Sequence, residues 1–195
     1  MIDAAASDAI LALVALVAGL RLLQRGGGAG TAGVGLILVG IAATFGTIRF
    51  GGVQSLAQAH DGVSRLASLV GIPLVGSGYL SVAFFPQHAV AVRPYVFVSL
   101  LVAAVALIGV PLYGTVIGGA AMIGAAVAAI VGLRRPPSAA AEGLAGAVGV
   151  LLCGLVVSGE GSWGPLSRTA WLHLGLSASC ALLATGLLRG APSEG

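Results

Sequence analysis

Long apolar runs with few charges are the feature that most constrains the fold of this chain. Only 8% of its 195 residues are charged and 58% are hydrophobic, whereas soluble domains carry about 25% charged residues. A helix of about 20 apolar residues is long enough to cross the hydrocarbon core of a bilayer. Seven such runs can be drawn, at residues 6–23, 31–50, 62–85, 92–110, 112–133, 139–158 and 169–189. We therefore predict one all-α, multi-pass integral membrane domain over residues 1–195, in the cytoplasmic membrane if the chain is bacterial.

The arginines predict how the domain is oriented. All nine basic residues are arginine, and the net charge is +3. Six of them fall on one side of the predicted spans: Arg21, Arg25, Arg93, Arg134, Arg135 and Arg189. By the positive-inside rule this side is cytoplasmic, which puts the N-terminus outside. Because the positive charge orients helices in this way, we expect the lipid bilayer and no nucleic acid as a partner. The absence of lysine excludes a retinal Schiff base.

A repeated motif predicts that the domain arose by duplication. Residues 60–64 read "HDGVS" and residues 173–177 read "HLGLS", both of them His-x-Gly-x-Ser, at an offset of 113 residues. The same offset aligns Arg21 with Arg134 and Phe50-Gly51 with Trp163-Gly164. We predict a 3+1+3 fold in which helices 1–3 (about 1–85) and helices 5–7 (about 112–190) flank a connector helix (about 90–110). The two units would be parallel, related by a pseudo-two-fold axis along the membrane normal.

This symmetry predicts a polar site near the outer membrane face. His60 and His173 would lie at the same depth, with Ser64 and Ser177 one turn deeper on the same helix faces. The candidate ligand-binding residues are His60, His173, Ser64, Ser177, Asp61, Arg49 and Arg168. In this hypothesis the imidazoles bind a small-molecule ligand, Asp61 orients or charges His60, and the two arginines attract an anionic group. Asp3 and Asp8 are expected at the outer N-terminus.

A metal or haem cofactor is the first interpretation of the paired histidines. Two imidazoles can hold haem iron axially, and zinc accepts mixed nitrogen and oxygen ligands. The candidate metal ligands are His60, His173, Asp61 and Glu160. Two histidines that reach water or headgroups about one turn inside the interface, without any ligand, are the structural alternative. His88 is expected on the cytoplasmic side, apart from the other two histidines.

Two resemblances give further alternatives, one a transporter or sensor and the other an enzyme. The order of three helices, connector and three helices resembles the architecture of the sugar-transporting SWEET and PQ-loop proteins, which implies a substrate site on the repeat axis. The segments "HDGVSRLASLVGIP" and "AWLHLGLSAS" are similar to helices of the progestin-receptor and alkaline-ceramidase superfamily, which implies a zinc-dependent intramembrane lipid hydrolase. That superfamily holds zinc with three histidines, whereas Thr169 and Ser177 flank His173 at four-residue spacing here.

Small residues predict close helix packing. The stripe Ala120, Gly124, Ala128 and Gly132 has the four-residue spacing that lets two membrane helices approach each other. Such Gly/Ala-rich faces also suit a homo-oligomer. The glycine run "GGGAG" at residues 26–30 is predicted to be a short cytoplasmic turn between the first two spans.

Overall fold

The computed structural model of the chain is almost entirely helical over the residues it describes, which are 2–85, 96, 98–103, 113–132, 136–157 and 161–190. Its α-helices are α1 (Ile2–Arg25), α2 (Gly27–Phe50), α3 (Ala57–Leu66), α4 (Ile72–Phe84), α6 (Tyr113–Val131), α7 (Pro137–Leu152) and α8 (Arg168–Gly190). The 3₁₀ turn η1 (Gln54–Leu56) precedes α3, and the π-helical turns η2 (Ala67–Gly71) and η3 (Cys153–Val157) follow α3 and α7. Strands β1 (Ser162–Trp163) and β2 (Leu166–Ser167) form a short hairpin before α8, which sequence analysis did not predict.

Six of the seven predicted spans are confirmed as helices long and apolar enough to cross a membrane. They are Ile2–Arg25, Gly27–Phe50, Gln54–Phe84, Tyr113–Val131, Pro137–Val157 and Arg168–Gly190. Most of the remaining span, 92–110, lies outside the described residues, although residues 98–103 are helical. Leu100 and Leu101 from that segment pack against Leu69, Val70 and Leu74. The structure is therefore compatible with a polytopic membrane protein.

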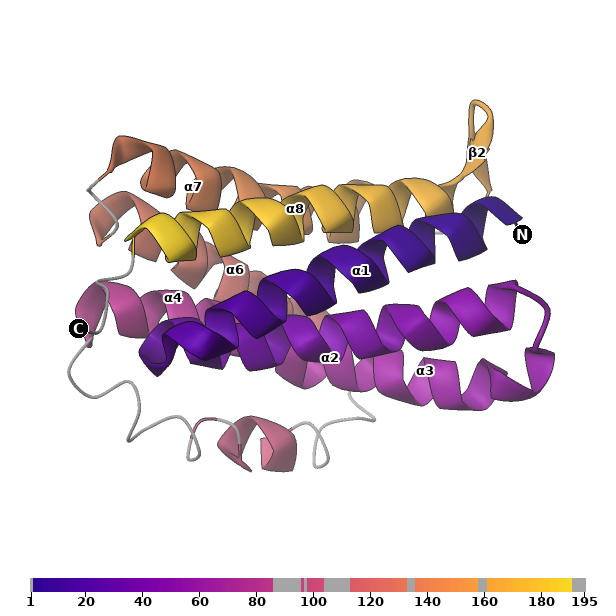
Figure 1. Cartoon of the computed structure of the whole chain (residues 1–195), viewed down its shortest axis with the longest axis horizontal. Helices are drawn as coiled ribbons and strands as arrows, with labels where there is room; N and C mark the ends of the chain where they lie inside the picture. Colours follow the sequence, from indigo (N-terminus) through magenta and orange to yellow (C-terminus); the bar gives the residue numbers. More distant parts are fainter. Residues whose placement is uncertain are drawn as a thin grey trace.

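The helices form a closed ring that brings the first and last of them together (Figure 1). Around the ring, α1 packs against α2, α2 against α4, α4 against α6, α6 against α7, α7 against α8, and α8 against α1. The order of neighbouring helices in the α1–α2–α4 unit is thus the same as in the α6–α7–α8 unit. This is the neighbour order that a two-fold relation would produce, and the duplication itself stays a prediction.

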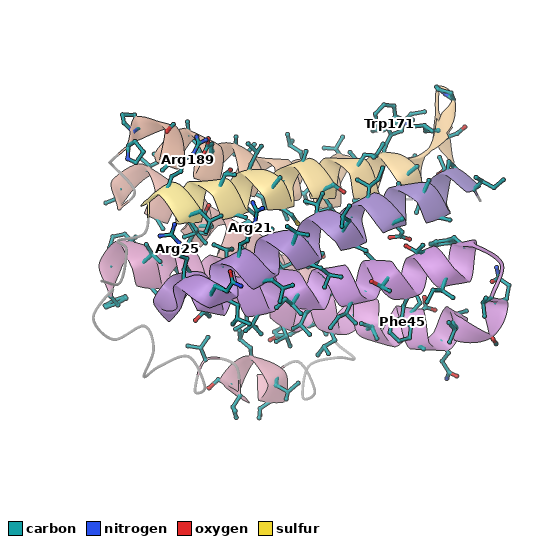
Figure 2. All side chains as sticks on the ribbon, in the orientation of Figure 1. Arg21, Arg25, Phe45, Trp171 and Arg189 are labelled. Atoms are coloured by element: carbon teal, nitrogen blue, oxygen red, sulfur yellow. The ribbon has the colours of Figure 1, made fainter. Side chains whose placement is uncertain are left out.

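The two ends of the bundle differ in their side chains. Figure 2 shows Arg21, Arg25 and Arg189 toward one end and Trp171 toward the other. The hairpin and the N-terminus lie at the Trp171 end (Figure 1). Arg93, Arg134 and Arg135, which complete the predicted cytoplasmic set, lie outside the described residues.

Glycine allows the helix backbones to touch. A methyl group on Gly19 would lie 2.8 Å from the carbonyl oxygen of Gly33, and one on Gly33 would lie 2.6 Å from that of Gly19. Much of the surrounding core is alanine. Membrane helices gain little from excluding water between them, so this close van der Waals packing is the main contact that holds α1 against α2.

The predicted small-residue stripe of α6 packs inside the chain for most of its length. Added methyl groups would lie 2.2 Å from Ala83 Cβ at Gly132 and 3.3 Å from Leu80 at Gly124. Ala128 is completely buried, whereas Ala120 is exposed. Three of the four stripe residues are therefore used for packing within the bundle.

Two predicted helix boundaries are wrong. The run at residues 26–30 is helical from Gly27 onward, so that only Gly26 separates α1 from α2. Glycine has a low helix propensity, but a methyl group on Gly28 would lie 2.8 Å from the Gly78 carbonyl oxygen, so packing against α4 favours glycine here. The third transmembrane helix begins before residue 62, and the motif at residues 60–64 lies within α3 rather than at its start.

Tyr79 joins the two halves of the ring in its interior. The side chain is fully buried, and its hydroxyl donates a hydrogen bond of 2.6 Å to the Leu183 carbonyl oxygen of α8. Gly143 and Gly186 make room for the ring, because a methyl group on either would lie within 3.0 Å of Tyr79. α4 is thereby fixed to α7 and α8.

We expect Tyr79→Phe to lower the stability of the bundle by about 1 kcal/mol, because it removes this hydrogen bond and keeps the ring. For a chain of this size the thermal unfolding midpoint should fall by about 2–4 °C. The measurement is thermal unfolding in mild detergent, with Tyr113→Phe as the control because Tyr113 is only half-buried. An equal shift in both variants would contradict this role of Tyr79.

Candidate functional site

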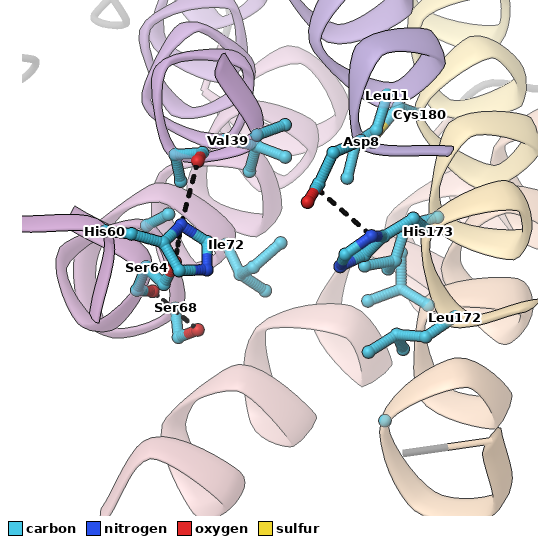
Figure 3. A pocket seen from close by; sticks show the side chains of 16 residues that line it. Asp8, Leu11, Val39, His60, Ser64, Ser68, Ile72, Leu172, His173 and Cys180 are labelled. Atoms are coloured by element: carbon cyan, nitrogen blue, oxygen red, sulfur yellow. Dashed lines mark hydrogen bonds and ion pairs between the residues drawn. The ribbon is translucent and has the colours of Figure 1, made fainter. Parts of the chain in front are cut away.

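The candidate site is a cavity of about 330 Å³ inside the ring (Figure 3). Residues of α1, α2, α3, α4, α7 and α8 line it, together with residues of the π-helical turns η2 and η3. Most of these side chains are apolar. The charged and polar residues among them are Asp8, His60, Ser64, Ser68 and His173. A mostly apolar cavity with a few convergent polar groups is the usual form of a small-molecule site.

His173 is held by a carboxylate from the other end of the chain. Asp8 of α1 is 1% exposed, and its Oδ1 lies 3.1 Å from His173 Nδ1. Ser7 Oγ lies 3.5 Å from the same nitrogen and donates its own hydrogen to the Ala4 carbonyl oxygen at 2.9 Å. With Asp8 as the carboxylate, both neighbours act as acceptors, which places the proton of a neutral His173 ring on Nδ1.

His60 is held in the same way by the backbone of α2. Its Nδ1 lies 3.3 Å from the Ala42 carbonyl oxygen and 3.4 Å from Ser64 Oγ. Because a carbonyl oxygen can only accept, the Nδ1 of this ring also carries the proton. Phe50 makes an edge-to-face contact with the imidazole at 5.8 Å between ring centroids.

Both histidines present their second ring nitrogen, Nε2, to the cavity. Figure 3 shows the two rings on opposite walls, each with its Nε2 turned inward. Among the described residues neither Nε2 has a hydrogen-bond partner. With Nδ1 protonated, each Nε2 carries a lone pair. The cavity therefore offers two acceptor or metal-ligand atoms that face each other.

Gly46 of α2 lets Asp8 and His60 approach the same point. A methyl group there would lie 2.3 Å from Asp8 Oδ2 and 3.0 Å from His60 Cε1. Within the part of the chain that the structure describes, this Oδ2 is buried and has no hydrogen-bond partner. One carboxylate oxygen thus binds His173, and the other is left beside the wall that carries His60.

The structure brings together only part of the predicted site. His60, His173 and Ser64 line one cavity. Ser177 is buried and donates to the His173 carbonyl oxygen at 2.7 Å, one turn earlier in α8, and it is not among the lining residues.

The predicted charged residues of the site are engaged elsewhere. Asp61 Oδ1 pairs with Arg49 Nη1 at 2.7 Å, and the Asp61 side chain is 58% exposed. It turns away from His60, whose Nδ1 is bonded to Ala42 and Ser64 instead. Arg168 donates to the carbonyl oxygens of Val156 and Val157, so neither arginine lines the cavity. Glu160 and His88 lie outside the described residues.

Asp8 is the functional candidate that sequence analysis did not assign to the site. It was expected at the outer N-terminus and was given no role, whereas the structure buries it beside His173. Its position within the start of an apolar run, one turn before Leu11, could have indicated that Asp8 lies inside a membrane span. An ionisable residue within a membrane span marks a functional site by default.

The cavity is not arranged for a zinc ion with three or more protein ligands. Among the described residues, no group of three or more His, Cys, Asp or Glu side chains could hold a metal. Asp61 cannot join His60 and His173, because it lies at the surface beside Arg49. Two imidazoles alone suit haem iron, for which the porphyrin supplies the other four nitrogens.

Comparison of the chain with models of protein families, with curated proteins and with solved structures finds no match. The chemistry of the cavity is therefore the basis on which a function can be proposed.

We expect Gly46→Ala to destabilise the bundle by about 1–3 kcal/mol, because the added methyl group overlaps Asp8 Oδ2 and crowds His60. Asp8 is the side chain that must move, and its displacement would disturb its contact with His173. Gly62→Ala is the matched control, since a methyl group on this other helical glycine meets nothing within 4 Å. Thermal unfolding of both variants in one detergent checks this, and equal midpoints would refute the contact.

Proposed function

We propose that this is a multi-pass membrane protein that binds a small ligand between His60 and His173. The observation that carries the proposal is the pair of inward-facing Nε2 atoms, each on a ring whose Nδ1 is already bonded. Metal-binding and ligand-binding histidines are commonly oriented by a carboxylate or carbonyl on the other nitrogen. Here Asp8 and the Ala42 carbonyl provide those two contacts.

The depth of the polar contacts supports binding over a purely interfacial role. Histidines at an interface satisfy themselves with water or headgroups at little cost. The side chain of His173 is instead 14% exposed, and that of its partner Asp8 is 2% exposed. Burial of a carboxylate is expensive unless it is paired and hydrogen-bonded. Asp8 Oδ2 is buried without a partner among the described residues, so the contact of Oδ1 with His173 is what offsets the cost of burying this side chain.

A transporter or sensor is the second candidate function. The cavity lies inside a ring whose neighbour order suits a two-fold repeat, and such proteins bind substrate at the repeat interface. Both π-helical turns contribute lining residues, Ala67 and Ser68 from η2 and Gly154 from η3. π-helical turns inside α-helices are frequent at functional sites. Uptake by vesicles that contain the protein would separate transport from binding alone.

We expect protein purified in mild detergent, without a histidine tag, to retain a ligand that His60→Gln and His173→Gln lose. Glutamine keeps a polar side chain of similar length but removes the fixed Nε2 acceptor. Elemental analysis detects a metal or haem, and mass spectrometry of an organic extract detects a metal-free ligand. Gln58→Ala is the control, because Gln58 is exposed and close to His60 in α3.

Circular dichroism and thermal unfolding would establish that each variant is folded. The same molecule retained in equal amount by the wild type and both folded histidine variants would contradict the proposed site. The proposal would also be contradicted if the wild-type protein purifies without a ligand, binds no added small molecule and is not stabilised by any.

A further inference from the structure

We propose that the ligand is a membrane-dissolved hydroquinone, whose two hydroxyls donate to His60 Nε2 and His173 Nε2 and whose apolar tail leaves sideways along α6. This inference rests on the proposed function, because it names the ligand class of the same cavity. Three observations support the inference: the polarity of the cavity, the opposed positions of its hydrogen-bond acceptors, and a groove that joins the cavity to the side of the bundle.

The cavity presents acceptors to its ligand. The Nε2 atoms of His60 and His173 face inward, each with a lone pair. Ser68, which also lines it, directs its hydrogen to the Ser64 carbonyl oxygen at 3.0 Å. Of the described residues that line the cavity, none is an arginine. An anionic or acceptor-only ligand would leave these groups unmatched, so the ligand must donate hydrogen bonds. The expectation of an anionic group is revised accordingly.

The two histidines stand on opposite walls (Figure 3). A para-dihydroxy aromatic ring carries one donor at each end and a flat apolar body between them. Leu11, Ile72 and Leu176 provide apolar wall for such a body. The oxidised quinone has two carbonyl oxygens in place of the hydroxyls and can only accept. With both histidines neutral and protonated on Nδ1, the cavity therefore discriminates in favour of the reduced form.

A groove joins this cavity to the side of the bundle. Its volume is about 510 Å³, and it shares Ser68, Ile72, Val150 and Gly154 with the histidine cavity. Ser68 and Gly154 are both exposed, so the connection is open at the surface.

The walls of the groove suit a hydrocarbon tail. On the α6 side three glycines, Gly114, Gly118 and Gly119, line it together with Thr115, Met122 and Ile123, and the glycines widen it. Ile123 and Leu155 at its edge are 58% and 70% exposed, and on a transmembrane helix such apolar surface faces lipid. A ligand that arrives from the bilayer can thus insert its polar head and leave its tail in the groove.

The test uses 2-decylhydroquinone, titrated without oxygen into the full-length protein in mild detergent and followed by calorimetry. We expect saturable binding of one molecule per chain. The 1,4-dimethyl ether, which keeps the shape and loses both donors, should bind at least about tenfold more weakly, as should the oxidised quinone. His60→Leu and His173→Leu should each weaken binding of the hydroquinone by about tenfold, whereas Gln58→Leu should not.

Gly119→Leu tests the groove separately from the head site. A methyl group at Gly119 meets nothing within 4 Å, so leucine can enter the groove without disturbing the helix packing. It should weaken binding of decylhydroquinone by about tenfold and leave methylhydroquinone, which has no tail, unaffected. Gly62→Leu is the matched control, because Gly62 is equally open but lies outside the groove.

The outcomes separate the two proposals. Equal binding of the hydroquinone and its dimethyl ether, or an equal effect of Gly119→Leu on both tail lengths, overturns the hydroquinone proposal. A haem or metal that co-purifies with the wild type and is lost in the histidine variants also overturns it, but supports the proposed function. If hydroquinone does not bind and no co-purified ligand depends on the histidines, both proposals fail.

Discussion

The site depends on the burial of the Asp8 carboxylate against His173. A carboxylate deep in an apolar bundle is tolerated only when it has a partner, and removal of one member of a buried pair leaves the other at high cost. Because Asp8 is on the first helix and His173 on the last, this contact lies where α1 and α8 close the ring. The orientation of the His173 ring, the position of the free Asp8 oxygen and the choice of glycine at position 46 all follow from it.

Run length and hydropathy predicted most of the fold, because a bilayer allows few ways to satisfy a backbone. Six spans are confirmed, and all except the third, which begins at Gln54 instead of residue 62, lie within four residues of their predicted ends. The errors occur where tertiary packing outweighs local preference. Gly27 to Gly30 are helical because α2 packs closely against α4, a contact that no local pattern reveals. The short hairpin before α8 was not predicted for a different reason: its two-residue strands are too short to show the alternation of polar and apolar residues that marks a strand.

The sequence predicted the two histidines of the candidate site but not the groups that hydrogen-bond to them. The equal spacing of the two His-x-Gly-x-Ser motifs predicted one depth for His60 and His173, and the structure lines one cavity with both. The carboxylate assigned to His60 was Asp61, its neighbour in sequence, which on a helix points to a different side and pairs with Arg49. The actual contacts come from Asp8, distant along the chain, and from the main-chain oxygen of Ala42, which no side-chain motif encodes.

The π-helical turn η2 separates the segment that carries His60 from the segment that packs the core. Such a turn accommodates one residue more than a regular helix, and each residue of an α-helix turns its neighbours by about 100°. Loss of a single residue between Ala67 and Gly71 would therefore turn η2 into regular α-helix and leave α3 with His60 and α4 with Tyr79 close to their present orientations. At this one place in the third transmembrane helix, a deletion that a regular helix would pass on as a rotation is thus absorbed locally, and the histidine keeps its place in the bundle.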